Sequence, residues 1–127
     1  MIPGYVSEAV TAFGRQLGLQ TLALNDRGAA GVDFENGISV RLEYADGALL
    51  VRAGVTGCDS AAALRRALLA AHPSAQEGSP LRVVRFARSG ETAFVQRVPE
   101  RAADAHAIGE AFQRVWTAAD RARRAGE

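Results

Sequence analysis

Residues 17–55 decide the fold of this chain, and they read LGLQTLALNDRGAAGVDFENGISVRLEYADGALLVRAGV. Apolar residues at four-three-four spacing come before this stretch, which predicts a helix over about residues 5–17. Gly18 stands where a left-handed C-terminal cap is expected. Short segments of alternating apolar and polar residues follow, each bounded by a turn signal. The chain is therefore predicted to begin with a helix and a three-stranded meander.

Turn sequences divide this stretch into strands. We expect short strands at 21–25 and 31–35, which are either two strands or one interrupted element, and longer strands at 38–44 and 48–55. Asn, Asp and Gly tolerate the backbone angles of tight turns, and the dipeptides Asn-Gly and Asp-Gly are typical of hairpins. The turn signals are Asn25-Asp26-Arg27-Gly28, Asn36-Gly37 and Asp46-Gly47.

Helix and strand signals also alternate in the second half of the chain. The sequence predicts an alanine-rich helix over 60–71, a hairpin of strands 81–87 and 92–98, and a final helix over about 104–123. The expected order is α-β-β-β-α-β-β-α, an α+β sandwich with a mostly antiparallel twisted sheet and helices packed on one side. The apolar stripe of the last helix consists of Ile108, Phe112, Val115, Ala119 and Ala122.

Composition favours a single domain, 1–127, in a reducing compartment. The chain has 127 residues, 48% of them hydrophobic, with no repeat and no linker. All 15 basic residues are arginines, and 14 acidic residues leave a net charge of +1, which creates no overall field for nucleic acid or an anionic membrane. Cys58 is the single cysteine, and no apolar run is long enough to span a bilayer. We expect a cytosolic protein without a secretory signal.

The sequence offers no convincing catalytic or metal site. Cys58 with His72 or His106 is the obvious nucleophile pair, but no third orienting group stands at a recognisable spacing. These residues also lack the spacing of a zinc site. We therefore expect no enzymatic activity, no cofactor and no metal, so that any function comes from a binding surface.

In element order and in several short motifs the chain resembles the class I chaperones of bacterial type III secretion, which include the Tir and Yop effector chaperones. The motifs are the helix end Leu17-Gly18-Leu19, the Leu22-x-Leu24 segment, the Asn25-Asp26-x-Gly28 turn and the Asp46-Gly47 hairpin. The resemblance implies a homodimer in the bacterial cytoplasm, with no nucleotide or metal. Its partner is the N-terminal chaperone-binding segment of a secreted effector, held extended and non-globular and kept competent for export.

The resemblance also implies where the two interfaces lie. Dimerisation would use the second helix and the strand after it, and the effector would bind apolar patches on the first helix and the sheet. An extended segment can add a strand to a free sheet edge, for which 21–25 and 31–35 are the candidates. The dimer-interface candidates are Leu64, Ala67, Leu68, Ala71, Val83 and Arg85. The effector-binding candidates are Val6, Phe13, Leu22, Leu24, Val32 and Phe34, which are core residues in the alternative interpretation.

Two other functions fit parts of the sequence. A non-secretory protein-interaction or regulatory domain on the same fold would share the dimer and the groove. An arginine-rich nucleic-acid module would need exposed aromatic residues among its arginines, but we expect Phe86 and Phe94 to lie in the core. The arginines of such a nucleic-acid module would be Arg82, Arg85, Arg88, Arg121, Arg123 and Arg124.

Chaperones of the resembled family are usually acidic, whereas this chain is not, so we expect apolar contacts and not charge to dominate client binding.

Overall fold

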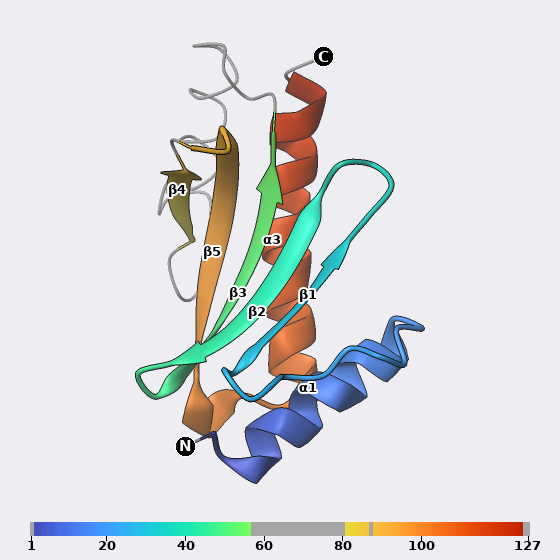
Figure 1. Ribbon diagram of the computed structural model, residues 1–127, viewed down its shortest axis with the longest axis vertical. Coiled ribbons are helices and arrows are strands. Elements are labelled where there is room, and N and C mark those ends of the chain that lie inside the picture. The colour runs from blue at the N-terminus through green and yellow to red at the C-terminus, as the bar shows by residue number, and fades with distance from the viewer. Residues whose placement is uncertain (1, 57–80, 87, 126–127) are drawn as a thin grey trace.

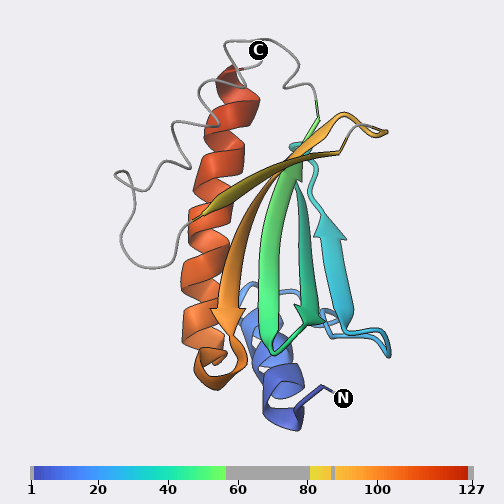
Figure 2. The same cartoon turned by 90° about the vertical axis from the view of Figure 1, so that its left-hand side faces the viewer.

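The computed structural model describes residues 2–56, 81–86 and 88–125. It has an α+β fold in which one five-stranded antiparallel sheet, of order β1-β2-β3-β5-β4, packs against two helices on the same side (Figures 1 and 2). The predicted helix over 60–71 lies outside the described residues. The elements are α1 (Gly4–Gln16), β1 (Ala29–Asp33), β2 (Ser39–Ala45), β3 (Ala48–Val55), β4 (Arg82–Phe86), β5 (Glu91–Pro99), the 3₁₀ turn η2 (Glu100–Ala102) and α3 (Ala105–Ala125).

The end of α1 confirms the cap expected from the sequence. Gly18 has a φ of 76°, in the left-handed region that favours glycine. Its N–H donates to the carbonyl of Arg15 at 3.0 Å, and the N–H of Leu19 donates to the carbonyl of Gly14 at 2.7 Å. This pair of bonds is the Schellman arrangement, which satisfies carbonyls that the helix itself leaves open. The chain thereby leaves α1 in a fixed direction.

The hairpins also form where the turn sequences predict them. Asp46 and Gly47 both have positive φ, 50° and 74°, as a two-residue turn of type I′ requires. The turn before β2 closes through the N–H of Phe34, which donates to the carbonyl of Ile38 at 2.9 Å. Gly90, with a φ of 71°, occupies the turn between β4 and β5.

One predicted strand does not form. Residues 21–25 run as a loop between α1 and β1, because no neighbouring strand among the described residues offers this segment a ladder of backbone hydrogen bonds. Alternation is necessary for a half-buried strand but does not by itself supply a partner. The strand predicted at 31–35 is β1, which begins and ends two residues earlier.

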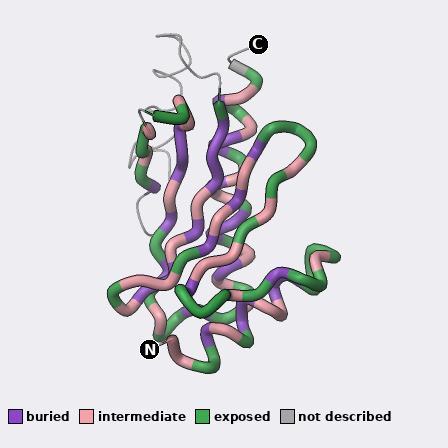
Figure 3. Tube along the Cα trace, in the orientation of Figure 1, coloured by how far each residue is buried: buried purple, intermediate pink, exposed green. Residues whose placement is uncertain are grey.

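The core lies between the sheet and the two helices (Figure 3). α3 packs across β3 and β5, and α1 packs against α3. Every residue of the predicted stripe on α3 is buried, as the 3.6-residue period requires for a helix that covers a sheet. Alternate side chains of β3 are fully buried on the helix side, namely Leu49, Val51, Ala53 and Val55.

The connection from β5 to α3 is tied back to the β2–β3 hairpin. The N–H of Glu100 donates to the carbonyl of Gly47 at 3.0 Å. The Tyr44 hydroxyl donates to the Glu100 carboxylate, and this hydrogen bond raises the pKa of Tyr44 because it favours the neutral phenol. These contacts set the position from which α3 starts across the sheet.

Candidate protein-binding surfaces

Three of the six effector-binding candidates lie in the core of the chain. Val6, Phe13 and Leu22 are 0%, 2% and 6% exposed. The ring of Phe13 packs against that of Phe112 with centroids 5.4 Å apart, so α1 uses this face to hold α3. The expectation that these three side chains offer apolar surface to a client needs correction, because packing of α1 between α3 and the loop before β1 covers them.

The other three candidates lie at the rim of the core. Leu24, Val32 and Phe34 are partly buried and pack against it. The ring of Phe34 meets Trp116 of α3 edge-on, with centroids 4.9 Å apart. These side chains therefore keep part of their surface at the β1 side of the molecule, where the sheet ends.

β1 forms one edge of this sheet, and its register with β2 shows which of its backbone groups face outward. The N–H of Tyr44 donates to the carbonyl of Gly28, and the N–H of Phe34 donates to the carbonyl of Ile38. These two bonds lie just before and just after β1 along the chain. They show that the even-numbered residues of β1 make the backbone hydrogen bonds to β2. The odd-numbered residues of β1 therefore turn their N–H and C=O groups away from the sheet.

Two of these outward residues are open to a partner strand. Ala29 is already held by Asn25, whose N–H donates to the Ala29 carbonyl at 2.9 Å and whose Oδ1 accepts from the Ala29 N–H at 3.1 Å. Gly31 and Asp33 have no strand partner on this side among the described residues. A shallow hollow of about 90 Å³ lies beside Gly31, between β1 and the loop that carries Leu22.

An ion pair between Arg41 and Asp33 lies at the C-terminal end of β1. Arg41 donates to Asp33 Oδ1 at 2.8 Å, and this bond holds the pKa of the Asp33 carboxyl below its usual range. The aliphatic part of Arg41 lies over Gly31, where an added Cβ would come within 2.5 Å of Arg41 Cδ. Glycine at this position therefore lets Arg41 lie flat along the edge strand and reach Asp33.

The dimer candidates divide between two parts of the chain. Leu64, Ala67, Leu68 and Ala71 lie outside the described residues. Val83 and Arg85 lie on β4, the second edge of the sheet, where Val83 is partly buried against the core and Arg85 is exposed. Both point to the helix side of the sheet, because their neighbours on β4 line the opposite face.

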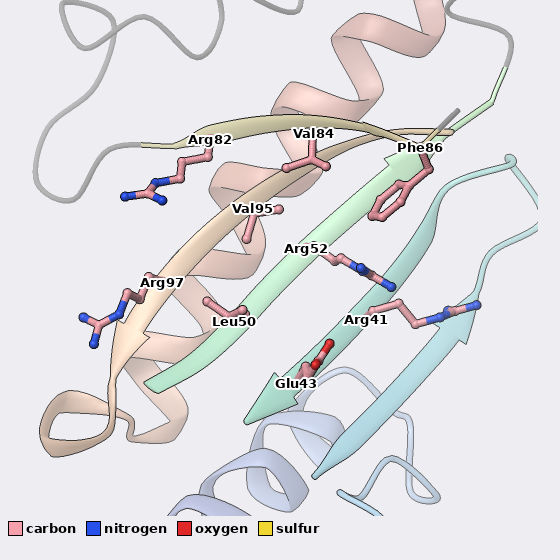
Figure 4. Close-up of a pocket in the computed structure, with 9 residues that line it drawn as sticks. All are labelled: Arg41, Glu43, Leu50, Arg52, Arg82, Val84, Phe86, Val95 and Arg97. Carbon is pink, nitrogen blue, oxygen red and sulfur yellow. The ribbon is translucent and has the colours of Figure 1, made fainter. Parts of the chain in front are cut away.

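That opposite face carries a groove that the sequence interpretation missed. The sheet twists so that β4 crosses β5 steeply (Figure 2). The face turned away from α3 has a hollow of about 300 Å³, whose lining side chains are drawn in Figure 4. We call it the open-face groove. Its charged lining consists of Arg41, Arg52, Arg82, Arg97 and Glu43. Its apolar lining consists of Leu50, Val84, Phe86 and Val95.

The sequence contains the residues of this groove, but the sequence pattern assigned Phe86 to the core. Phe86 was expected in the core, yet it is only partly buried and faces the open side, where the Arg52 guanidinium lies 5.3 Å from its ring centroid. Position parity on β4 separates Val83 from Phe86, so both cannot face the helices. Alternation of arginine with apolar residues on the same face of β3 and β5 was the pattern to recognise.

The described residues show no other kind of site. Within 2–56, 81–86 and 88–125, no group of three histidine, cysteine, aspartate or glutamate side chains is placed to hold a metal ion. No helix in these ranges is long and apolar enough to cross a membrane.

Neither a protein-family model nor a curated protein matches the sequence. Solved structures do match. A chain of the ExsC–ExsE complex aligns with a TM-score of 0.74 at 17% identity, over 94% of this chain and 91% of that one. A chain of the HopA1–SchA chaperone–effector complex aligns with a TM-score of 0.74 at 19% identity, over 95% and 94%. The structure of the Yersinia pestis type III secretion chaperone SycH with a fragment of YscM2 gives 0.65 at 16% identity, over 94% and 98%.

These alignments span nearly the whole chain, at identities too low for sequence comparison alone. They confirm, at the level of the fold, the resemblance read from the helix end and the turns. This chain has the fold of the type III secretion chaperones.

Proposed function

We propose that this protein is a cytoplasmic bacterial chaperone that binds the N-terminal segment of a type III secreted effector in extended form and keeps it competent for export. The observation that carries the proposal is a chaperone fold in which Gly31 and Asp33 lie on a sheet edge with no partner strand among the described residues. An extended client adds a strand there through backbone hydrogen bonds and places alternate side chains beside Leu24, Val32 and Phe34. The solved chaperone–effector complexes of this fold support the same class of partner.

Strand addition suits a client that is disordered alone. Such a segment loses conformational entropy when it binds, and backbone bonds along a preformed edge offset this cost without demanding one sequence. The hollow beside β1 and the rim residues then supply the apolar contacts. We also propose that the protein is a homodimer built on residues 60–71 and β4, which would present two such edges to one client.

The first test is purification of the tagged protein from its native organism and identification of what accompanies it. We expect one partner, bound through its N-terminal region. A partner that is not exported would favour the non-secretory interaction domain and would contradict the proposal.

The edge itself is tested with Asp33→Pro and Asp33→Ala. Both remove the ion pair to Arg41, but only proline also removes the outward N–H and blocks a partner strand. We expect Asp33→Pro to weaken binding of the labelled N-terminal segment of the captured client about tenfold, as loss of one or two hydrogen bonds predicts. Asp33→Ala serves as the matched control and should bind within about twofold of the wild type. Equal binding by both variants would show that the client does not use this edge.

A further inference from the structure

We propose that the open-face groove is a second peptide-binding surface, and that its occupant is an acidic segment with alternating apolar residues. The groove lies on the side of the sheet away from α1 and α3, so it is separate from the β1 rim (Figure 4). The proposal rests on the lining of this groove and not on the identity of any effector. It therefore stands or falls separately from the function proposed above.

The first argument is charge. Four arginines and a single glutamate line the groove. Arg41 is directly opposite Arg52 in the β2–β3 register, an arrangement of like charges that destabilises a sheet unless something compensates it. Asp33 neutralises Arg41, whereas Arg52, Arg82 and Arg97 have no carboxylate partner among the described residues. An acidic occupant would supply the missing counter-charges.

The second argument is the apolar floor between these charges. Leu50, Val84 and Val95 come from three different strands and line the hollow between the guanidinium groups of Arg82 and Arg97 at one side and Arg52 at the other (Figure 4). Val84 on the edge strand β4 is 39% exposed, and together with Leu50 and Val95 it makes a contiguous apolar patch, the kind of exposed surface that marks an interaction site. An extended segment repeats every two residues, so its alternate side chains can meet the floor while the others reach the arginines.

The lining argues against two other occupants. A nucleic acid without sequence preference needs open aromatic faces for its bases, but the ring of Phe86 is covered by the Arg52 guanidinium and the remaining floor is aliphatic. A second copy of the chain related by a two-fold axis would bring the same patch against itself. That arrangement would place the arginines of one copy against those of the other.

The groove is tested with a fluorescein-labelled dodecapeptide of alternating glutamate and leucine, followed by fluorescence anisotropy on the full chain. Comparison probes replace glutamate with lysine, replace leucine with serine, or use a single-stranded oligothymidylate. We expect the glutamate–leucine peptide to bind, more tightly at low salt, and each change of probe to weaken binding about tenfold or more. Equal binding of the lysine peptide, or tighter binding of the oligonucleotide, would overturn the proposal.

Matched variants locate the site. Arg82→Glu with Arg97→Glu reverses two charges of the groove, and we expect at least about tenfold weaker binding of the glutamate–leucine peptide. Arg15→Glu with Arg121→Glu makes the same change of net charge at two exposed positions outside the groove and should leave binding within about threefold of wild type, the remaining loss reflecting net charge alone. Val84→Ser tests the apolar floor without changing charge. Equal weakening by both double variants would mean that net charge and not the groove binds the peptide.

Three controls keep the outcome unambiguous. Circular dichroism checks folding, and Arg82→Gln with Arg97→Gln replaces the charge reversal if that variant unfolds. Sedimentation tests the second copy as occupant, because a wild-type dimer that these groove variants convert to a monomer would overturn the proposal. Asp33→Pro should bind the peptide like Asp33→Ala, because both variants release Arg41 from its ion pair and only proline blocks the β1 edge. Agreement of these two variants distinguishes failure of the groove from failure of the β1 edge.

Discussion

Gly18 shows at the residue scale how one position directs the path of the chain. Its left-handed conformation allows the two bonds that close α1, and an added Cβ there would meet nothing within 4 Å. The need for glycine is therefore conformational and not steric. Gly31 is the opposite case, since there the Arg41 side chain occupies the space a Cβ would take.

Substitution of Gly18 by alanine should show that the end of α1 needs glycine for its backbone conformation. We expect Gly18→Ala to lower the free energy of unfolding by about 1 kcal/mol, because alanine is strained at positive φ. Gly4→Ala is the matched control in the same helix, with nothing within 4 Å and no positive φ, and it should be neutral or stabilising by up to about 1 kcal/mol. Urea denaturation measures both. If Gly18→Ala proved as neutral as Gly4→Ala, the cap bonds would tolerate alanine and something else would fix the end of α1.

At the element scale, α3 combines a local start signal with a long apolar stripe. Asp104 lies just before the helix, and its Oδ1 accepts a hydrogen bond from the N–H of Ala107 at 2.7 Å. The stripe then covers β3 and β5 along the length of the helix. Local capping thus decides where α3 begins, and the sheet decides which face it buries.

Removal of the Asp104 cap should cost stability without changing the fold. We expect Asp104→Ala to lower the free energy of unfolding by about 1 kcal/mol, because the first N–H groups of the helix lose their acceptor. Asp104→Ser, which keeps a capping oxygen, should restore most of the loss. Thermal unfolding followed by circular dichroism would detect the difference, and an unchanged midpoint for the alanine variant would show that water replaces the cap.

At the scale of the whole molecule, the sheet has two different faces and two edges. The helices cover one face, the open-face groove occupies the other, and β1 and β4 form the edges. A chain with a net charge of only +1 can therefore still present a strongly basic local surface. The expectation that apolar contacts dominate client binding rested on the net charge of the whole chain, which does not describe this local distribution.

The proposed dimer belongs to this scale. Leu64→Glu with Leu68→Glu should convert a dimer of the 13.4 kDa chain to a monomer, because the interface would bury two unpaired charges. Such an interface should bury about 1,600 Å² in total. The matched control is Gln113→Glu with Thr117→Glu, two exposed positions with the same spacing on α3. Sedimentation velocity decides the question, and a double leucine variant that stays dimeric would place the contact elsewhere.

The sequence by itself determined what depends on neighbours along the chain. Helix periodicity, the left-handed glycine after α1 and the Asp46-Gly47 turn act over a few residues, so the elements and most of their bounds could be predicted. Only the tertiary structure decided that residues 21–25 find no strand partner in the described part of the chain and that Phe13 is core. It also decided that Phe86 faces the groove. These outcomes depend on β5 pairing with β3 across the sheet and on α1 meeting α3, contacts between segments far apart in the chain that no local pattern encodes.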